Sequence, residues 1–348
     1  MSGNEIAVKC SGITKTFGGV VANDDINLEV KYGEILALLG ENGSGKTTLM
    51  NMLSGIYHPD KGTIAISGKT VAINSPKDSI ALGIGMIHQH FKLVEVFTAA
   101  DNIVAGTKGS LKGKGAVRDE INKISEQLGL EVDPDKKVYN MSVSEKQTVE
   151  ILKVLYRGAK ILILDEPTAV LTPQETEKLF AILKKMKAQG CAIIIITHKL
   201  DEVMEVSDRA TILCDGKNVT TVETKDVTRE KLIEYMLGRP MDDMYGKQEA
   251  ELGEVLLSVA HLTRKGVFSD VSFEARRGEV LGFFGLVGAG RSEIMRAIFG
   301  VDAYDSGTIS IEGKPVTIAN PVQARRHGLA LVPEDRKKQG LVLGNTVG

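Results

Sequence analysis

Two long stretches of the sequence resemble each other at a constant spacing of 245 residues, and this internal repeat limits the possible folds more than any other feature. The stretch GEILALLGENGSGKTTLM, beginning at Gly33, recurs as GEVLGFFGLVGAGRSEIM, beginning at Gly278. Further on, DKGTIAISGK from Asp60 recurs as DSGTISIEGK from Asp305, again without a gap. A repeat of this length predicts two copies of one structural unit.

The repeat also determines the expected domain organisation. With an offset of 245, residue 348 of the second copy aligns with Ile103, so the second copy is expected to be incomplete. Residues 239–252 are polar and have no regular hydrophobic period, which is typical of a linker. We predict a first domain at 1–238, a linker at 239–252 and a partial second domain at 253–348.

Composition excludes several classes of protein. The 43 Lys and Arg residues against 45 Asp and Glu residues leave a formal charge of −2, unlike a polybasic nucleic-acid-binding arm or an acidic disordered tail. Cys10, Cys191 and Cys214 have no paired or clustered spacing, so neither a disulfide framework nor a Cys-rich metal site is predicted. No apolar run approaches the roughly 20 residues of a membrane span, so a membrane role is expected to depend on a partner.

The first copy carries the pattern Gly-x-x-x-x-Gly-Lys-Thr between an expected strand at Ile35–Leu39 and an expected helix at Thr47–Leu53. This arrangement predicts a P-loop, in which backbone N–H groups surround phosphate oxygens at a helix N-terminus. Lys46 is expected to reach the β- and γ-phosphates, and Thr47 to offer a hydroxyl to Mg²⁺. The expected ATP-binding residues of the loop are Gly40, Glu41, Asn42, Gly43, Ser44, Gly45, Lys46, Thr47 and Thr48.

An apolar strand expected at Ile161–Asp165 ends in two carboxylates. Asp165 suits coordination of Mg²⁺, and Glu166 suits polarisation of an attacking water molecule. A second apolar strand, Ala192–Ile196, is followed by His198. That histidine is either structural or, at the carboxyl edge of a parallel sheet, directed at the phosphate site.

A third strand-like segment, Ile84–Phe91, carries Gln89 between His88 and His90. No acidic or cysteine partner lies near the two histidines in the sequence, so a separate metal site is not predicted. Gln89 is expected to act as a polar ligand near Mg²⁺ or water.

These motifs, together with MSVSEKQ at Met141–Gln147, resemble in order and spacing the ATPase subunits of ABC transporters. The tandem copies resemble the fused ATPase subunits of bacterial sugar and nucleoside importers. The resemblance implies an α/β fold: a P-loop NTPase of ABC type with a mixed sheet, an antiparallel β edge and a helical subdomain around Asp101–Leu155, followed by a partial second copy. GMIHQHFKLV and DEPTAVLTPQE look most like the nucleoside branch, whereas GLVGAGRSE and VPEDRKKQGLVLG resemble the ribose and galactose branch.

Further roles follow only from this resemblance. Phe17 would stack on adenine, unless it is an ordinary half-buried strand aromatic. Gln89 would report the γ-phosphate to the permease, and His198 would contact that phosphate. The apolar residues after Gln89 would either receive a permease coupling helix or pack in the core; they are Phe91, Leu93, Val94 and Phe97.

The signature motif of the family, LSGGQ, is altered in this chain. Ser142 is kept, but Val143 and Ser144 replace the two glycines that would allow close backbone approach to a phosphate, and Glu145 follows them. Glu145 also adds a negative charge. This signature is expected to be a poor phosphate clamp.

The second P-loop departs from the pattern as well. Its residues are Gly285, Gly288, Gly290, Arg291 and Ser292. Arg291 aligns with Lys46, and a planar guanidinium is not interchangeable with a lysine ammonium. Glu334 aligns with Gln89 and is unfavourable beside phosphates.

In ABC ATPases each ATP lies between the P-loop of one domain and the signature of the other, so the resemblance places both defects in one composite site. The competent site would combine Lys46, Thr47, Gln89, Asp165, Glu166 and His198 with a signature from a second ABC domain or subunit. A signature in the second copy would align near residue 387, beyond residue 348. We expect the chain to bind ATP and Mg²⁺ and to hydrolyse ATP weakly or not at all when isolated.

The resemblance implies a cytoplasmic ATPase subunit, peripheral on the inner face of the cell membrane, with permease subunits and a solute-binding protein as partners. One alternative is a soluble tandem ABC ATPase acting on ribosomes or DNA. The near-neutral charge and the acid-containing linker disfavour it, and no nucleic-acid partner is expected. Another alternative is a nucleotide-binding fragment without turnover.

Overall fold

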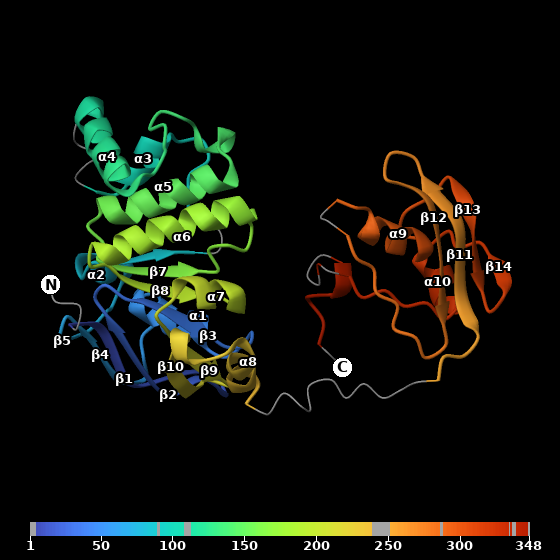
Figure 1. Ribbon diagram of the computed structural model, residues 1–348, viewed down its shortest axis with the longest axis horizontal. Coiled ribbons are helices and arrows are strands. Elements are labelled where there is room, and N and C mark those ends of the chain that lie inside the picture. Colours follow the sequence, from blue (N-terminus) through green and yellow to red (C-terminus); the bar gives the residue numbers. More distant parts are fainter. Residues whose placement is uncertain are drawn as a thin grey trace. The chain divides into compact units, whose positions relative to one another are not determined.

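The computed structural model of the protein describes residues 5–88, 91–107, 113–238, 251–285, 288–333, 335 and 339–346. The chain forms two compact units, Met1–Tyr245 and Gly246–Gly348 (Figure 1).

A six-stranded mixed sheet lies at the centre of the first unit. Its strands, in spatial order, are β10 (Lys217–Glu223), β9 (Arg209–Cys214), β3 (Ile35–Leu39), β8 (Ala192–Ile196), β7 (Ile161–Asp165) and β6 (Ile84–Ile87). All neighbours pair in parallel except β9 and β10, which are antiparallel. Strands β3 and β8 are buried along their whole length, as expected of apolar parallel strands covered on both faces.

An antiparallel sheet accompanies the mixed sheet. Its strands are β2 (Val20–Lys31), β1 (Ile6–Phe17), β4 (Lys61–Ile66) and β5 (Lys69–Val71), in that order. This sheet is the antiparallel edge expected near the start of the chain.

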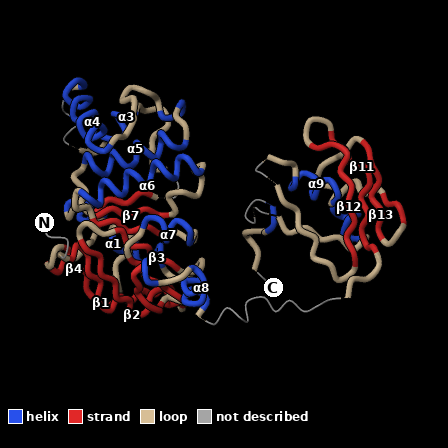
Figure 2. Tube along the Cα trace, in the orientation of Figure 1, coloured by secondary structure: helices blue, strands red, loops and turns tan. Residues whose placement is uncertain are grey.

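The helices of the first unit cover the mixed sheet and form a helical layer beyond it (Figures 1 and 2). They are α1 (Lys46–Leu53), α2 (Pro76–Ala81), α3 (Ala99–Val104), α4 (Lys114–Leu128), α5 (Val143–Tyr156), α6 (Pro173–Ala188), α7 (Leu200–Val206) and α8 (Arg229–Leu237), with short 3₁₀ turns at Val138–Asn140 and Thr224–Asp226. Helices α3, α4 and α5 fall in the expected helical insert. Among the described residues, none of the helices combines the length and hydropathy that a bilayer span requires.

Alternation along the central strands divides the core between two faces, because successive side chains of a strand point in opposite directions. Leu36 and Leu38 of β3 pack with α1 and the antiparallel sheet. Ile193 and Ile195 of β8 pack with the side of α5 and α6. Ile35 of β3 packs on this second side as well, so the P-loop strand is covered on both faces.

The second unit repeats the antiparallel sheet and the first helix. Strands β12 (Phe268–Arg276), β11 (Val255–Arg264), β13 (Ser306–Ile311) and β14 (Lys314–Val316) have the spatial order of β2, β1, β4 and β5. Helix α9 (Arg291–Ile298) corresponds to α1, and α10 (Pro321–Arg326) corresponds to α2.

One segment of the second unit differs from its counterpart. Residues 280–284 align with β3 but form no strand, and Val280 and Phe284 are 99% and 100% exposed. In the first unit β3 lies between β8 and β9, and no described strand of the second unit pairs with residues 280–284. An apolar strand sequence thus needs its neighbours to adopt the extended paired form.

Candidate nucleotide-binding site

The P-loop connects β3 to α1, and its glycines are required by close packing. Gly45 is the N-cap of α1 with φ 92°, and a Cβ there would lie 2.4 Å from the carbonyl oxygen of Ala22. A Cβ on Gly40 would lie 2.3 Å from the carbonyl oxygen of Leu213. No side chain fits at either position, so the backbone can close around a small anion.

We expect Gly45→Ala to destabilise the protein by more than about 2 kcal/mol, because strain at positive φ adds to a clash with backbone. Gly43→Ala is the matched control. Its φ is also positive, at 91°, but a Cβ there would meet nothing within 4 Å, so it should cost only about 1 kcal/mol. Denaturant unfolding measures both, and equal losses would show that packing around Gly45 is unimportant.

Lys46 is the first residue of α1 and is buried despite its charge. Its Nζ donates hydrogen bonds to the carbonyl oxygens of Gly40, at 2.7 Å, and Glu41, at 2.8 Å. Burial lowers the pKa of the ammonium, while the charges of Glu166 and Asp165 act to raise it. The ammonium therefore lies inside the loop, within the electrostatic range of both carboxylates.

The carboxylates and His198 come together at the carboxyl ends of β7 and β8. The Nδ1 atom of His198 lies 3.0 Å from the Oε1 atom of Glu166, and the two share a hydrogen bond. Glu166 has φ 46° and its backbone N–H donates to the carbonyl oxygen of Ile196. A left-handed backbone is strained for a glutamate. In this conformation the Glu166 side chain reaches His198 in the loop after β8.

Asp165 lies beside them in a partly buried position. Burial, followed by the charge of Glu166, raises the pKa of Asp165, and Lys46 opposes that rise. The desolvated carboxylate of Asp165 and the hydroxyl of Thr47, the residue after Lys46, are hard oxygen ligands of the kind that Mg²⁺ prefers. Together with the loop and the Lys46 ammonium, this donor set fits ATP with Mg²⁺.

The raised pKa of Asp165 gives a pH prediction. The folded state favours the protonated carboxyl, so this contribution to stability is present below the ordinary pKa and is lost as pH rises through the folded pKa. At neutral pH, Asp165→Asn should therefore raise Tm by a few degrees at most while weakening Mg²⁺-dependent ATP binding. Thermal unfolding without nucleotide should show the gain shrinking as pH approaches the ordinary aspartate pKa. A lower Tm for the variant at neutral pH would contradict this.

Phe17 lies at the exposed end of β1 and is 42% exposed. Its ring meets that of Tyr57 edge-on at 5.1 Å, and the Lys15 ammonium lies 5.5 Å from its centroid. The other strand of this hairpin reaches the P-loop, because Asn23 Nδ2 donates to the carbonyl oxygen of Gly45 at 3.2 Å. Phe17 is thus an accessible ring on the strand pair that contacts the loop, and its stacking on adenine stays a prediction.

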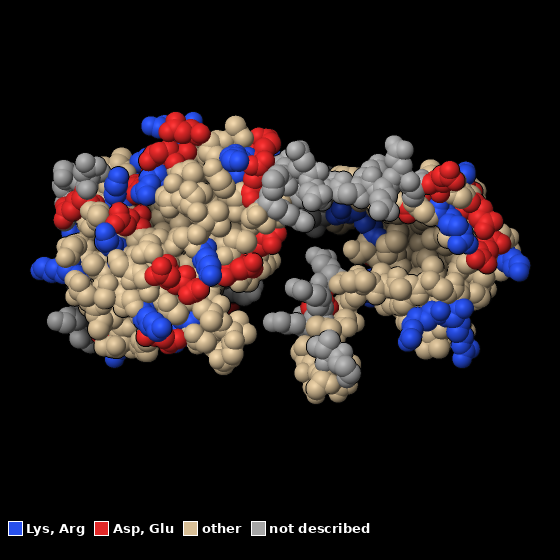
Figure 3. Space-filling model, turned by 90° about the horizontal axis from the view of Figure 1, so that it is seen from below, with Lys and Arg blue, Asp and Glu red and all other residues tan. Residues whose placement is uncertain are grey.

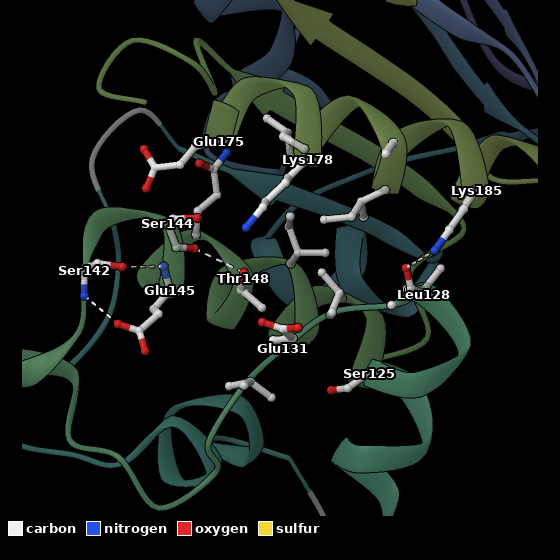
Figure 4. Close-up of a pocket in the computed structure, with 18 of the residues that line it drawn as sticks. Ser125, Leu128, Glu131, Ser142, Ser144, Glu145, Thr148, Glu175, Lys178 and Lys185 are labelled. Atoms are coloured by element: carbon white, nitrogen blue, oxygen red, sulfur yellow. Dashed lines mark hydrogen bonds between the residues drawn. The ribbon is translucent and has the colours of Figure 1, made fainter. Parts of the chain in front are cut away.

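The altered signature lies at the start of α5, where Ser142 is the N-cap. Its hydroxyl accepts from the Glu145 backbone N–H at 3.2 Å, and its own N–H donates to the Glu145 carboxylate at 2.8 Å (Figure 4). Glu145 also lies 2.6 Å from the Lys136 ammonium, and this hydrogen bond lowers the pKa of Glu145. Ser142 and Glu145 therefore form a capping box. The Lys136 ammonium offsets the negative charge of Glu145.

Beside the signature, α4, α5 and α6 enclose a pocket of about 830 Å³. Ser144 and Thr148 of α5 face Glu175 and Lys178 of α6 across it (Figure 4). Among the described residues of this unit, no hydrogen bond or ion pair joins residues 142–145 to Lys46 or Asp165.

The second P-loop keeps the positive φ of two of the three glycines of the first, since Gly285 lacks the positive φ of its counterpart Gly40. Gly290 is the N-cap of α9 with φ 82°, as Gly45 is for α1, and Gly288 has φ 84°. Arg291 is the first residue of α9, and the next residue, Ser292, is exposed. Sequence reasoning missed Glu293, an acid in the first turn of α9 that opposes phosphate binding and aligns with Thr48.

The expected site residue Gln89 and its counterpart in the second copy, Glu334, lie outside the described residues, as do residues 239–250 of the expected linker. Sequence reasoning also missed how Gln147 is used. It is buried, and its Nε2 donates to the carbonyl oxygen of Pro167, directly after Glu166, at 2.9 Å. The available signal in the sequence was a polar residue at the helical spacing of Ile151 and Val154, since a buried amide needs a hydrogen-bond partner.

The comparisons with known proteins agree with this geometry. The sequence profile of the ABC transporter family matches residues 23–169 and 268–345. The chain is 45% identical over 352 aligned positions to the nucleoside import ATP-binding protein NupA of Lactococcus lactis subsp. cremoris, covering 99% of this chain and 70% of the relative. It is 44% identical to the ribose import ATP-binding protein RbsA 1 of Streptomyces avermitilis, covering 100% of this chain and 67% of the relative.

Solved structures give the same result for the fold. An ATP-binding cassette of an ABC transporter in its ADP conformation matches with a TM-score of 0.60 and 27% identity, over 67% of this chain and 99% of the cassette. A nucleotide-free ATP-binding cassette from an ABC transporter matches with a TM-score of 0.60 and 25% identity, over 70% of this chain and 100% of the cassette. The chain therefore belongs to the ABC transporter family and is an ATP-binding subunit of that family.

Proposed function

We propose that this chain energises a bacterial importer of simple sugars or nucleosides by binding and hydrolysing ATP at its first P-loop. The observation that carries the proposal is the buried Lys46 ammonium inside a glycine cradle, close to Asp165 and to the Glu166–His198 pair. The names of the relatives, which are import ATP-binding proteins for nucleosides or ribose, supply the solute class.

The site residues have distinct roles in this proposal. The loop N–H groups and Lys46 bind and orient the phosphates, and Thr47 and Asp165, with Gln89, hold the Mg²⁺ that neutralises phosphate charge when it is bound. Glu166 accepts the proton of the attacking water. His198 holds the Glu166 carboxylate through its Nδ1 atom and contacts the γ-phosphate.

The permease would dock on the segment that follows β6. Val94, Val96 and Phe97 are 46%, 64% and 43% exposed, and Tyr139 beside them is 59% exposed. Asn102 supports this segment by accepting from the backbone N–H of Val94 and donating to its carbonyl oxygen. Apolar side chains held outward by a buried amide suit a partner surface.

A pocket of about 220 Å³ adjoins the same segment, with Lys92 and Arg157 in its wall. The Nε atom of Arg157 is buried and has no hydrogen-bond partner among the described residues. The exposed apolar side chains after β6 support a peripheral location on the inner face of the membrane, in contact with permease subunits, within a complex that also includes a solute-binding protein on the other side.

The rival function, a soluble ATPase acting on ribosomes or DNA, has less support. Lys and Arg side chains alternate with Asp and Glu side chains over the visible face of the first unit (Figure 3). Phosphate-backbone binding favours a stripe of one sign.

The decisive experiment places the chain with its permease in vesicles together with the solute-binding protein. Mg²⁺-dependent ATP turnover should rise when ribose, galactose or a nucleoside is supplied to the binding protein. The two solute classes are tested side by side because the sequence motifs divide between them. ATP turnover that does not change with any solute, together with sedimentation of the chain with ribosomes, would support a soluble ATPase acting on ribosomes.

A further inference from the structure

A nearly buried carboxylate lies behind the Glu166–His198 pair and joins two loops. Glu202, in the first turn of α7, has a side chain that is 13% exposed. Its Oε2 atom accepts from the hydroxyl of Thr168 at 2.7 Å and from that of Thr197 at 3.5 Å. Both threonines are almost fully buried, at 1% and 3% exposure.

Lys199 closes the same network. Its ammonium lies 3.0 Å from Glu202 Oε1 and donates to the carbonyl oxygen of Thr168, also at 3.0 Å. Its backbone N–H donates to the hydroxyl of Thr197 at 3.0 Å. Each polar group of the cluster therefore has a partner, and Glu202 is the acceptor on which two of the loops' hydroxyls converge.

The network connects the segments that carry the two functional side chains. Thr168 lies two residues after Glu166, and Thr197 and Lys199 lie on either side of His198. The hydrogen bond between Glu166 Oε1 and His198 Nδ1, 3.0 Å long, joins the same two segments. The separation of these loops decides whether that bond can form, and the Glu202 network fixes the separation.

We propose that Glu202 is a positioning residue that sets the Glu166–His198 geometry and, through it, the recognition of the γ-phosphate. The proposal rests on the proposed function, in which His198 contacts that phosphate. Removal of Glu202 would leave two buried hydroxyls without their acceptor and the Lys199 ammonium without its counter-ion. The loops would then move apart or repack, while the P-loop, which holds the other phosphates, would keep its own contacts.

The test compares the affinities of the full chain for ATP and for ADP, with Mg²⁺, by calorimetry below the Tm of each variant. Glu202→Ala should reduce the preference for ATP over ADP about tenfold, the scale of one charge-assisted hydrogen bond. Its affinity for ADP should stay within about twofold, because ADP lacks the phosphate in question. Glu202→Gln keeps an acceptor oxygen, so its preference for ATP over ADP should fall only about threefold.

Glu205→Ala is the matched control, since Glu205 is on the same helix, is 54% exposed and lies 4.0 Å from Lys184. It should behave as the wild type does. If Glu202→Ala does not fold, Glu202→Gln and the nearly isosteric Thr168→Val, which removes one donor to Glu202, decide the matter with expected losses of about threefold each.

The outcomes separate the two proposals. A wild-type chain that binds neither nucleotide overturns the proposed function, and the role of Glu202 with it. A wild-type chain that binds ATP, with variants whose preference stays within twofold of it, overturns the role of Glu202 alone. Equal weakening of ATP and ADP shows a merely structural residue and likewise overturns the positioning role.

Discussion

Glu166→Gln should lower ATP turnover by at least about 100-fold, the usual contribution of a general base. Glutamine keeps the shape of the side chain and an oxygen that can face His198 Nδ1, but it cannot accept a proton from water. Affinity for ATP should stay the same or rise slightly, because a negative charge near the phosphates is lost. Phosphate release by the vesicle-bound transporter and equilibrium ATP binding measure the two effects.

Glu177→Gln provides the comparison, since this glutamate is exposed on α6 and should leave both quantities unchanged. Turnover by Glu166→Gln within threefold of the wild type would assign the role of base to another group. A parallel loss of ATP binding would instead mean that Glu166 supports the loop.

Lys46→Ala should weaken ATP binding about 100-fold, because it removes the charge-assisted hydrogen bonds that a buried ammonium makes to phosphate. It also takes away the donor that lies 2.7 Å from the Gly40 carbonyl oxygen and 2.8 Å from that of Glu41, so the empty loop loses order as well. The stabilisation that ATP gives the wild type in thermal unfolding should nearly vanish.

Lys184→Ala is the control for the loss of a positive charge, since Lys184 is 53% exposed on the surface. It should change neither ATP affinity nor the thermal shift. ATP binding by Lys46→Ala within fivefold of the wild type would contradict the role of the ammonium and would direct attention to the backbone cradle.

Much of the first unit was predictable because its strongest sequence signals are local. The apolar runs at β3, β7 and β8 are too hydrophobic to lie anywhere but in a covered parallel sheet, and each is formed as expected. The carboxyl ends of such strands meet at one edge, which is why Asp165 and Glu166 were expected at the phosphate site, while for His198 the pattern left a structural role open.

The rest depends on contacts between distant residues. The network of Glu202 with Thr168 joins positions 34 apart, and nothing in the local sequence distinguishes that glutamate from a solvated acid in a helix. The sequence predicted the negative charge of Glu145, but not its pairing with the Lys136 ammonium. Residues 280–284 have the composition of a strand but lack described partners.

The hydrogen bond from Gln147 to the Pro167 carbonyl oxygen ties the signature helix to the peptide that follows Glu166. A helix of this length bends little, so a displacement of α5 is passed to Gln147 and to the hydrogen bond that it makes. Separating Gln147 from the Pro167 carbonyl oxygen would cost about 1 kcal/mol, the net contribution of one such hydrogen bond. A tilt of α5 therefore either carries the peptide after Glu166 with it or breaks this hydrogen bond.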